Sequence, residues 1–304
     1  MSSEEPRMSQ VNELASAPTL DVVPEIVDLR SRVPLNPPQA VQEKFVGSSY
    51  FDAYSEAARF VDRAFQHWPN GAVEDQAILD FGAGWGRITR MLLRRFEAPQ
   101  IWTSDVDAQM TVLIHSTLAG VNAMTNAAMP PMAFREGMFD AVTAFSVFSH
   151  LSEDAHKRWA KEFGRVTRVE GMVYITLLEE NFLGQVAGAQ SAVEAGTADN
   201  FTTKLAKVLP EPTNALEQFR RGKFIYGGGG EDGPRSKDFY GWAVAPRPWL
   251  ERTWGDAGFA IESWIPTGEL FEQAMVVLVR RSDGGFGRRL LAKIMRIATR
   301  IRNH

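Results

Sequence analysis

The chain has 304 residues, of which 44% are hydrophobic and 23% are charged, so a globular protein with a buried core is expected. Its length suits one large elaborated domain or two small ones. The formal net charge of -4 gives no reason to expect nucleic acid as a partner. Because cysteine is absent, disulfides, thiolate zinc sites and a cysteine nucleophile are excluded, and a reducing cytoplasmic location is expected.

The N-terminal part, residues 1–40, is rich in proline, serine and glutamate, which predicts a mobile or loosely docked arm. The first residues are acidic and polar, without the basic start and apolar run of a secretory signal. No stretch approaches the roughly 18 uninterrupted apolar residues of a membrane span, so a soluble protein is expected.

Residues 50–67 carry apolar side chains at helical spacing, which predicts an amphipathic helix. Short apolar strands and helices then alternate from residue 76 to residue 178. The expected strands are 76–81, 101–105, 119–124, 139–148 and 171–178, and the expected helices are 88–96, 108–119 and 152–168. This alternation predicts a parallel sheet covered on both faces.

Residues 181–250 break the alternation and are too long for a simple connection, so we expect an insertion that covers the substrate. A helix over 246–258, ended by Gly258, then leads to two strands, 259–265 and 274–281. These strands must pair antiparallel, because a parallel crossover needs about a dozen residues or more. The main domain is therefore expected to span residues 41–281.

The last segment, residues 282–304, predicts a basic amphipathic helix. It has two open interpretations: a helix docked on the body or on a second subunit, or a helix on an anionic membrane surface. Nothing else in the chain supports nucleic-acid binding by this segment. The apolar face consists of Phe286, Leu290, Leu291, Ile294, Ile297 and Ile301.

Glycines alternate directly after the strand that ends at Asp80, at Gly82, Gly84 and Gly86. Glycine allows a sharp turn and a close approach of a ligand to the backbone, and the following helix N-terminus favours negative charge. In the dinucleotide fingerprint G-x-G-x-x-G the third glycine would stand at Arg87, so the match to a nicotinamide site is imperfect. A plain strand–helix turn without a ligand is the other alternative.

Asp105 ends the second predicted strand, beside the glycine loop. A carboxylate at this place can accept both hydroxyl hydrogens of a ribose. The alternatives are a solvated aspartate or a cap for the next helix, although Asp107 is better placed as the cap.

The segments LDFGAGWGR, SDVDAQM, FDAVTAFSVFSHL and GMVYITLL, in this order, resemble the successive motifs of class I S-adenosylmethionine-dependent methyltransferases. The resemblance covers roughly residues 75–180, and the strand pair near the C-terminus fits the same fold. It implies an α/β fold with a Rossmann-like, mostly parallel sheet of seven strands in the order 3-2-1-4-5-7-6, with strand 7 antiparallel.

The resemblance also implies how S-adenosylmethionine is held. The glycine loop would line the methionine part, with Asp80 close to it, and Asp105 would hold the ribose. Asn126 is the candidate for the adenine amino group, and Asn122 competes with it. The full set of expected cofactor residues is Asp80, Gly82, Ala83, Gly84, Gly86, Arg87, Asp105, Val106, Asn126 and Ser146.

His150 and Glu179 are the candidate catalytic residues, because each follows a strand at the edge of the sheet where ligands bind in this architecture. The histidine suits proton transfer from an acceptor hydroxyl near neutral pH, and a structural role is the equal alternative. His156 lies within the next helix and is expected at the surface. No metal is expected, because Glu179 and Glu180 are adjacent on a strand and point apart.

The insertion contributes Tyr226, Tyr240 and Trp242 as candidate acceptor-binding residues, since aromatic rings beside polar groups suit flat or sugar ligands. Trp249, Lys223 and Arg235 accompany them. The alternative is that these rings form the small core of the insertion itself. The glycines at 227–230 predict a hinge or lid.

Several shorter segments, such as FVGS at 45–48 and FEQAMVVLVRR at 271–281, resemble bacterial methyltransferases associated with glycan and polysaccharide synthesis. We therefore expect O-methylation of a saccharide or a related hydroxylated small molecule. A nicotinamide-dependent oxidoreductase and an inactive S-adenosylmethionine-binding scaffold are the alternatives.

Overall fold

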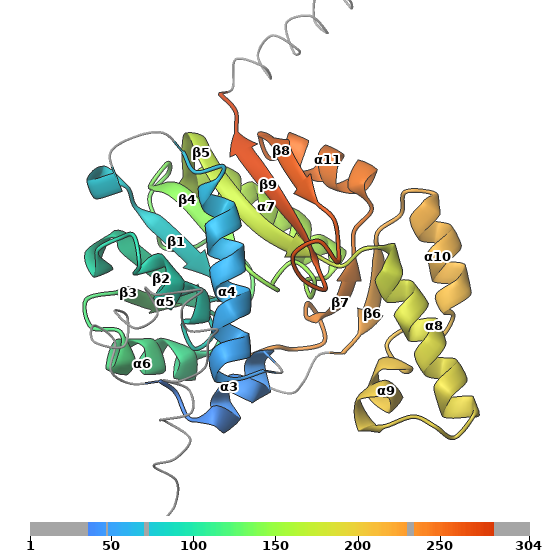
Figure 1. The fold of residues 1–304 in the computed structure, drawn as a ribbon. Coiled ribbons are helices and arrows are strands. Elements are labelled where there is room, and N and C mark those ends of the chain that lie inside the picture. Colours follow the sequence, from blue (N-terminus) through green and yellow to red (C-terminus); the bar gives the residue numbers. More distant parts are fainter. Residues whose placement is uncertain (1–35, 47, 70–72, 230–233, 283–304) are drawn as a thin grey trace, which may run out of the picture.

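A computed structural model describes residues 36–46, 48–69, 73–229 and 234–282 (Figure 1). Most of the predicted N-terminal arm and the predicted basic helix after residue 282 lie outside the described residues. The last part of the predicted arm enters a short helix, α3 (Gln39–Val46). Within the described part of the chain, no helix is both long and apolar enough to cross a membrane.

A seven-stranded sheet forms the centre of the fold, in the order β3-β2-β1-β4-β5-β9-β8. Only β9 runs antiparallel to its neighbours within this described sheet, which confirms the predicted order and strand direction. The third strand begins three residues later than predicted. The strands are β1 (Ile78–Phe81), β2 (Ile101–Asp105), β3 (Asn122–Thr125), β4 (Phe139–Ala144), β5 (Thr167–Leu177), β8 (Phe259–Ile265) and β9 (Ala274–Arg280).

Helices cover both faces of the sheet (Figure 1). On one face, α4 (Tyr50–Phe65), α5 (Arg87–Leu92) and α6 (Ala108–Thr117) share a core with the inward side chains of the strands. Phe60 and Val61 of α4 are fully buried there, which explains the apolar spacing of that helix. Short 3-10 turns, Val73–Asp75 and Ala98–Gln100, precede β1 and β2.

The opposite face is covered by α7 (Glu153–Val166) and α11 (Arg247–Asp256), which pack in the second large core. The Ser152 side chain caps α7, as its position predicts. The helix α11 ends just before Gly258, whose φ of +87° is a conformation that glycine adopts without strain.

His156 is buried in this second core, which corrects the prediction of a surface residue. Its Nε2 accepts a hydrogen bond of 3.1 Å from Trp254 Nε1, and Phe148 and Trp249 pack edge-on against its ring. Burial lowers the pKa of His156 to about 3. The apolar positions of α7 indicated a buried face, but the helical pattern does not distinguish a histidine that joins this face from one that stays in solvent.

Acid is expected to destabilise the protein through His156. Its pKa is lower in the folded than in the unfolded chain, so stability is lost as the pH falls below about 6.5. From pH 6.5 to 4.5 this amounts to about 2.3 kcal/mol. The substitution His156→Gln keeps an acceptor for Trp254 and removes the titration. Urea unfolding at pH 6.5 and pH 4.5 measures the loss of stability in acid. This loss should be smaller by that amount in His156→Gln than in the matched variant His115→Gln, which changes an exposed histidine. Equal losses in the two variants would contradict this assignment.

The insertion forms a small subdomain beside the sheet, with its own core (Figure 1). It consists of α8 (Glu180–Glu194), α9 (Asn200–Leu205), α10 (Pro212–Arg220) and the hairpin β6 (Ile225–Gly228) with β7 (Gly241–Val244). Trp249 belongs to α11 and packs in the main core instead. The first two glycines of the 227–230 run are part of β6, and whether the run acts as a hinge stays a prediction.

Candidate active site

The carboxyl ends of the parallel strands meet at one edge of the sheet, where the glycine loop follows β1. The four N–H groups of Gly82, Ala83, Gly84 and Gly86 are already bonded within the chain. The first two donate to Ser104 O, the third to Asp105 Oδ2 and the fourth to Ala83 O. A phosphate-binding loop directs such N–H groups at its ligand. This loop therefore does not present these four donors to a pyrophosphate.

The three glycines of the loop all have positive φ, but their surroundings differ. A Cβ atom at Gly82 would overlap Val147, and one at Gly86 would lie 2.9 Å from Leu118 Cδ1. A Cβ atom at Gly84 would meet nothing within 4 Å. The loop is thus packed against the protein at both ends and open in the middle, where a ligand can approach the backbone.

Alanine at Gly84 and at Gly82 is expected to have different effects. With φ of +53° and +68°, both carry a similar conformational cost of about 1–2 kcal/mol. The substitution Gly82→Ala adds an overlap with Val147 of about 1–3 kcal/mol and should lower the melting temperature more. The substitution Gly84→Ala should keep the fold and weaken S-adenosylhomocysteine binding, because its methyl group enters the open space. Wild-type affinity in Gly84→Ala would argue against a ligand there.

Asp105 is buried at the end of β2, and each of its carboxylate oxygens accepts one backbone hydrogen bond of 2.8 Å. One bond comes from Gly84 N and the other from Asp107 N. A carboxylate has about four acceptor positions, so two remain for the hydroxyl groups of a ribose. Asp107 itself accepts from Gln109 N and caps α6, as predicted. The ribose role of Asp105 fits this geometry and stays a prediction.

Asp80 lies under the glycine loop and is 1% exposed. Its oxygens accept from Thr89 Oγ1 at 2.6 Å and from Thr143 Oγ1 at 3.0 Å. Burial, together with the nearby charge of Asp105, raises the pKa of Asp80 to about 6. Burial also raises the pKa of Asp105. Thr89 and Thr143 are neutral, so they do not neutralise the negative charge that Asp80 carries when its carboxyl group is ionised.

Two buried carboxylates beside an open loop favour a ligand that carries positive charge. S-adenosylmethionine carries a sulfonium and an ammonium group, whereas the pyrophosphate of a nicotinamide cofactor is negative. The open position at Gly84, the acceptors left on Asp105 and the uncompensated Asp80 therefore fit S-adenosylmethionine. The antiparallel β9 also departs from the all-parallel sheet of the dinucleotide fold.

The adenine candidates lie at opposite ends of β3. Asn126 N donates to Asp105 O at 2.9 Å, so Asn126 lies beside the predicted ribose site, and Val106 follows Asp105 there. The Asn126 side chain also bonds Ser104 and Ala127 O. Asn122 starts β3 and donates to Pro99 O, at the far edge of the sheet. Of the two, only Asn126 is placed to reach an adenine.

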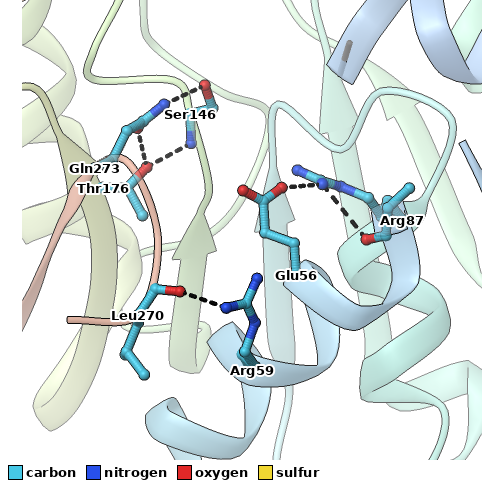
Figure 2. A network of polar contacts seen from close by, with 8 residues as sticks. Glu56, Arg59, Arg87, Ser146, Thr176, Leu270 and Gln273 are labelled. Atoms are coloured by element: carbon cyan, nitrogen blue, oxygen red, sulfur yellow. Dashed lines mark hydrogen bonds and ion pairs between the residues drawn. The ribbon is translucent and has the colours of Figure 1, made fainter. Parts of the chain in front are cut away.

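Arg87, at the start of α5, directs its side chain toward α4, and its role toward a cofactor stays a prediction. Its guanidinium pairs with Glu56 (Figure 2). The same group lies 4.8 Å from the centre of the Phe145 ring. The side chain is 6% exposed. Arg87 therefore fastens α4 to the helix behind the glycine loop.

Ser146 follows β4 with a φ of +56°, an unusual conformation for a residue other than glycine. Its N–H donates to Thr176 Oγ1 at 2.7 Å, and its hydroxyl accepts from Gln273 Nε2 at 3.0 Å (Figure 2). Gln273 belongs to the turn between β8 and β9. Arg59 of α4 donates a hydrogen bond of 2.8 Å to Leu270 O in the same turn. Sequence reasoning missed Thr176 and Gln273, which fix the backbone just before His150.

His150 is held in a stack of aromatic rings at the end of β4. Tyr240 lies parallel to it, with ring centres 4.8 Å apart, and Trp242 lies on it at 5.0 Å. Its Nδ1 donates to Gly241 O at 2.7 Å, because a carbonyl oxygen only accepts. Nε2 is therefore the basic nitrogen. Burial, together with the charge of Arg235, lowers the pKa of His150 to about 4.

Both carboxylate oxygens of Glu179 are bonded within the protein, and its catalytic role stays a prediction. Its Oε1 accepts from Trp264 Nε1 at 2.9 Å and its Oε2 from Thr267 N at 2.8 Å. It thus holds the end of β8, while Glu180 pairs with Arg220. Among the residues that the structure describes, no three histidine, aspartate or glutamate side chains gather as metal ligands would.

The aromatic residues of the insertion mostly pack on one another. Trp242 stacks on Phe182 at 5.1 Å, and Tyr226 donates to Lys237 O at 3.4 Å. Arg235 lies over Tyr240, with its guanidinium 5.9 Å from the ring centre, on the hairpin that reaches His150. Burial raises the pKa of Asp105, and the charge of Arg235 offsets part of that rise. The roles of these residues toward an acceptor stay predictions.

The chain is similar to a protein family and to solved methyltransferase structures. Residues 78–171 match the family described as methyltransferase domain. A methyltransferase of Clostridium acetobutylicum is 13% identical, with 80% of this chain and 97% of that chain covered and a TM-score of 0.49. Magnesium protoporphyrin IX methyltransferase of Synechocystis is 13% identical, with coverages of 89% and 100% and a TM-score of 0.49. No curated protein matches the chain.

The family match begins in β1 and ends in β5, so it contains the glycine loop, Asp80, Asp105 and His150. Residues 78–171 thus match a methyltransferase domain, and the sheet order and the open loop beside two buried carboxylates fit a site for S-adenosylmethionine.

Proposed function

We propose that the chain methylates a hydroxyl oxygen of a saccharide or a related hydroxylated small molecule, with His150 as the base. The observation that carries this proposal is the hydrogen bond from His150 Nδ1 to Gly241 O, which leaves Nε2 as a proton acceptor at the ligand edge. We expect the reaction in the cytoplasm. Contact with a membrane surface or with a second subunit through residues 282–304 remains part of the proposal.

When bound, S-adenosylmethionine supplies a methyl group activated by the sulfonium. The chain must then align the acceptor oxygen with that carbon and exclude water. As the carbon–oxygen bond forms and the carbon–sulfur bond breaks, the hydroxyl proton passes to His150 Nε2. The Tyr240 and Trp242 rings hold the imidazole in one orientation for this step.

The substitution His150→Ala is expected to lower kcat by about a hundredfold or more, the range for loss of a general base, without changing S-adenosylhomocysteine affinity. The measurement is transfer of a radiolabelled methyl group to a panel of saccharides. The matched variant His115→Ala removes an exposed histidine on α6 and should keep full turnover. Full turnover by His150→Ala would remove the base assignment, and cofactor binding without turnover on any acceptor would favour the inactive scaffold.

The pH profile gives a second check on His150. Since its pKa is about 4, kcat/KM for the acceptor should stay level from pH 8 to below 6 and fall only near pH 4. S-adenosylmethionine is kept saturating in this measurement, so that protonation of Asp80, whose pKa is about 6 in the free protein, does not limit cofactor binding. Removing the Arg235 charge in Arg235→Gln relieves one cause of the lowered pKa, so the acidic limb should move to higher pH. A wild-type limb at the ordinary histidine value, about 6.5, would contradict the burial of this group.

A further inference from the structure

A cleft of about 990 Å³ lies between the start of α8, the end of α10, the start of α11 and the β8–β9 turn. Its volume is within the range of ligand sites, about 300–1,000 Å³. Figure 1 shows the helices α8 and α10, which contribute to its lining, on the insertion side of the sheet. The residues of the glycine loop do not line the cleft. No part of the proposed methyl transfer accounts for this cleft.

Four arginines line the cleft, two from the end of α10 and two from α11. They are Arg220, Arg221, Arg247 and Arg252. Guanidinium groups bind carboxylate and phosphate oxygens in a paired geometry, so this residue type repeated from two helices indicates an anionic ligand. Phe219 and Trp264 add apolar surface on which the rest of such a ligand can lie.

The glutamates of the cleft do not cancel this charge. Glu179 has both carboxylate oxygens bonded to the end of β8, and Glu180 is paired with Arg220. Glu272 is then the remaining glutamate of the cleft lining that could offset the charge of the other arginines. Arg252 has no ion pair or hydrogen bond within the described part of the chain.

Two of the arginines have partners outside the cleft. Arg221 and Arg247 pair with Glu217 and Glu251 four residues away, and all four side chains are at least half exposed. Such pairs contribute about 0.3–0.5 kcal/mol each, less than a hydrogen bond to a charged ligand, so an anion can displace them.

The strand β7 connects the cleft to His150. Gly241, at its start, bonds the His150 ring, and Ala245, just after its end, lines the cleft. Four residue steps of an extended strand span about 13 Å. A ligand that reaches from His150 to the arginines must therefore be longer than one sugar ring.

We propose that this arginine-lined cleft binds an anionic group, a carboxylate or a phosphate, that an acceptor saccharide carries at a distance from the methylated hydroxyl. The proposal rests on the proposed function, because it assumes that a saccharide is the acceptor. It makes the acceptor an acidic oligosaccharide or a phosphorylated one, and it gives the insertion a role in choosing it.

The test is calorimetric titration of the full chain, saturated with S-adenosylhomocysteine, with four probes. These are trigalacturonic acid, its neutral counterpart maltotriose, maltose 1-phosphate and maltose. We expect binding of the carboxylate or the phosphate probe, much weaker binding of its neutral counterpart, and loss of affinity at high salt. The substitutions Arg252→Gln and Arg247→Gln should each raise the Kd of the bound probe about tenfold.

The control Arg158→Gln changes an exposed arginine of α7 that does not line the cleft and should leave the Kd unchanged. Equal binding of charged and neutral probes, no binding of either anionic probe, or unchanged affinity in both cleft variants would overturn the proposal. Binding of trigalacturonic acid would identify the anionic group as a carboxylate, and binding of maltose 1-phosphate would identify it as a phosphate. Failure of the proposed function is seen separately, as absence of methyl transfer to saccharides while the cleft variants still alter anion binding.

Discussion

Replacing Asp105 with alanine is expected to weaken S-adenosylhomocysteine binding by about a hundredfold. The carboxylate has two acceptor positions left after its bonds to Gly84 N and Asp107 N. Two hydrogen bonds from ribose hydroxyls to a charged acceptor contribute about 3 kcal/mol together, which corresponds to that change in Kd. The variant also loses the bond that fixes the open middle of the glycine loop. Isothermal titration of the full chain measures the change directly.

Asp107 provides a matched control for Asp105. The substitution Asp107→Ala removes the cap of α6 and should cost about 1 kcal/mol of stability while leaving cofactor affinity intact. The substitution Asp105→Asn keeps the shape but brings an N–H group where an acceptor is needed, so it should bind as weakly as Asp105→Ala. Equal affinity of Asp105→Ala and wild type would show that Asp105 only supports the loop.

The substitution Asp80→Asn is expected to stabilise the free protein at pH 8 and to weaken its cofactor binding. The carboxyl pKa is about 6 in the folded protein and near 3.8 when unfolded, so folding stability falls as the pH rises from about 4 to 6. Above pH 6 the buried charge costs about 3 kcal/mol. Asparagine removes this cost, although it loses part of the bonding to Thr89, so a net gain of about 1–3 kcal/mol is expected.

A cationic cofactor compensates the same buried charge, so Asp80→Asn should lower S-adenosylmethionine affinity by about tenfold or more at pH 8. Stability and binding then move in opposite directions, as expected where a residue is kept for function. Urea unfolding at pH 8 and pH 5 together with titration measures both. A variant that is less stable at both pH values and binds the cofactor normally would make Asp80 a purely structural residue.

Most of the fold follows from local patterns in the sequence. Apolar runs such as Ile78–Phe81 and the alternation with helices give a covered parallel sheet, and the close spacing of the last two strands requires them to pair antiparallel. The exception is β3, which lies at the edge of the sheet and has no fully buried residue. Its apolar pattern is weak for that reason, and the predicted strand was displaced.

The site was predictable where its residues stand at the ends of neighbouring parallel strands. Gly84 follows β1 and Asp105 ends β2, and the geometry places them in contact. The roles of Arg87, His156 and Glu179 depended on distant partners: Glu56, Trp254 and Trp264. Those pairings arise only when the helices and the β8–β9 turn pack together, and a single sequence carries no local pattern that predicts this packing.

The insertion shows the same limit. Its aromatic residues were recognised, but Trp242 is used to hold His150 and to pack on Phe182. The arginine-lined cleft combines residues from α10 and α11 that are about thirty positions apart, with no shared motif. Selectivity for the acceptor therefore depends on residues that only the folded structure brings together, whereas the cofactor loop is one continuous segment that the sequence alone reveals.

The most direct measurement is a calorimetric titration of the intact chain with S-adenosylhomocysteine and, separately, with NAD. The two buried carboxylates and the internally bonded glycine loop predict binding of S-adenosylhomocysteine, its loss in Asp105→Ala, and no binding of NAD. Binding of NAD without S-adenosylhomocysteine, or equal S-adenosylhomocysteine binding by wild type and Asp105→Ala, would contradict the assignment of this site.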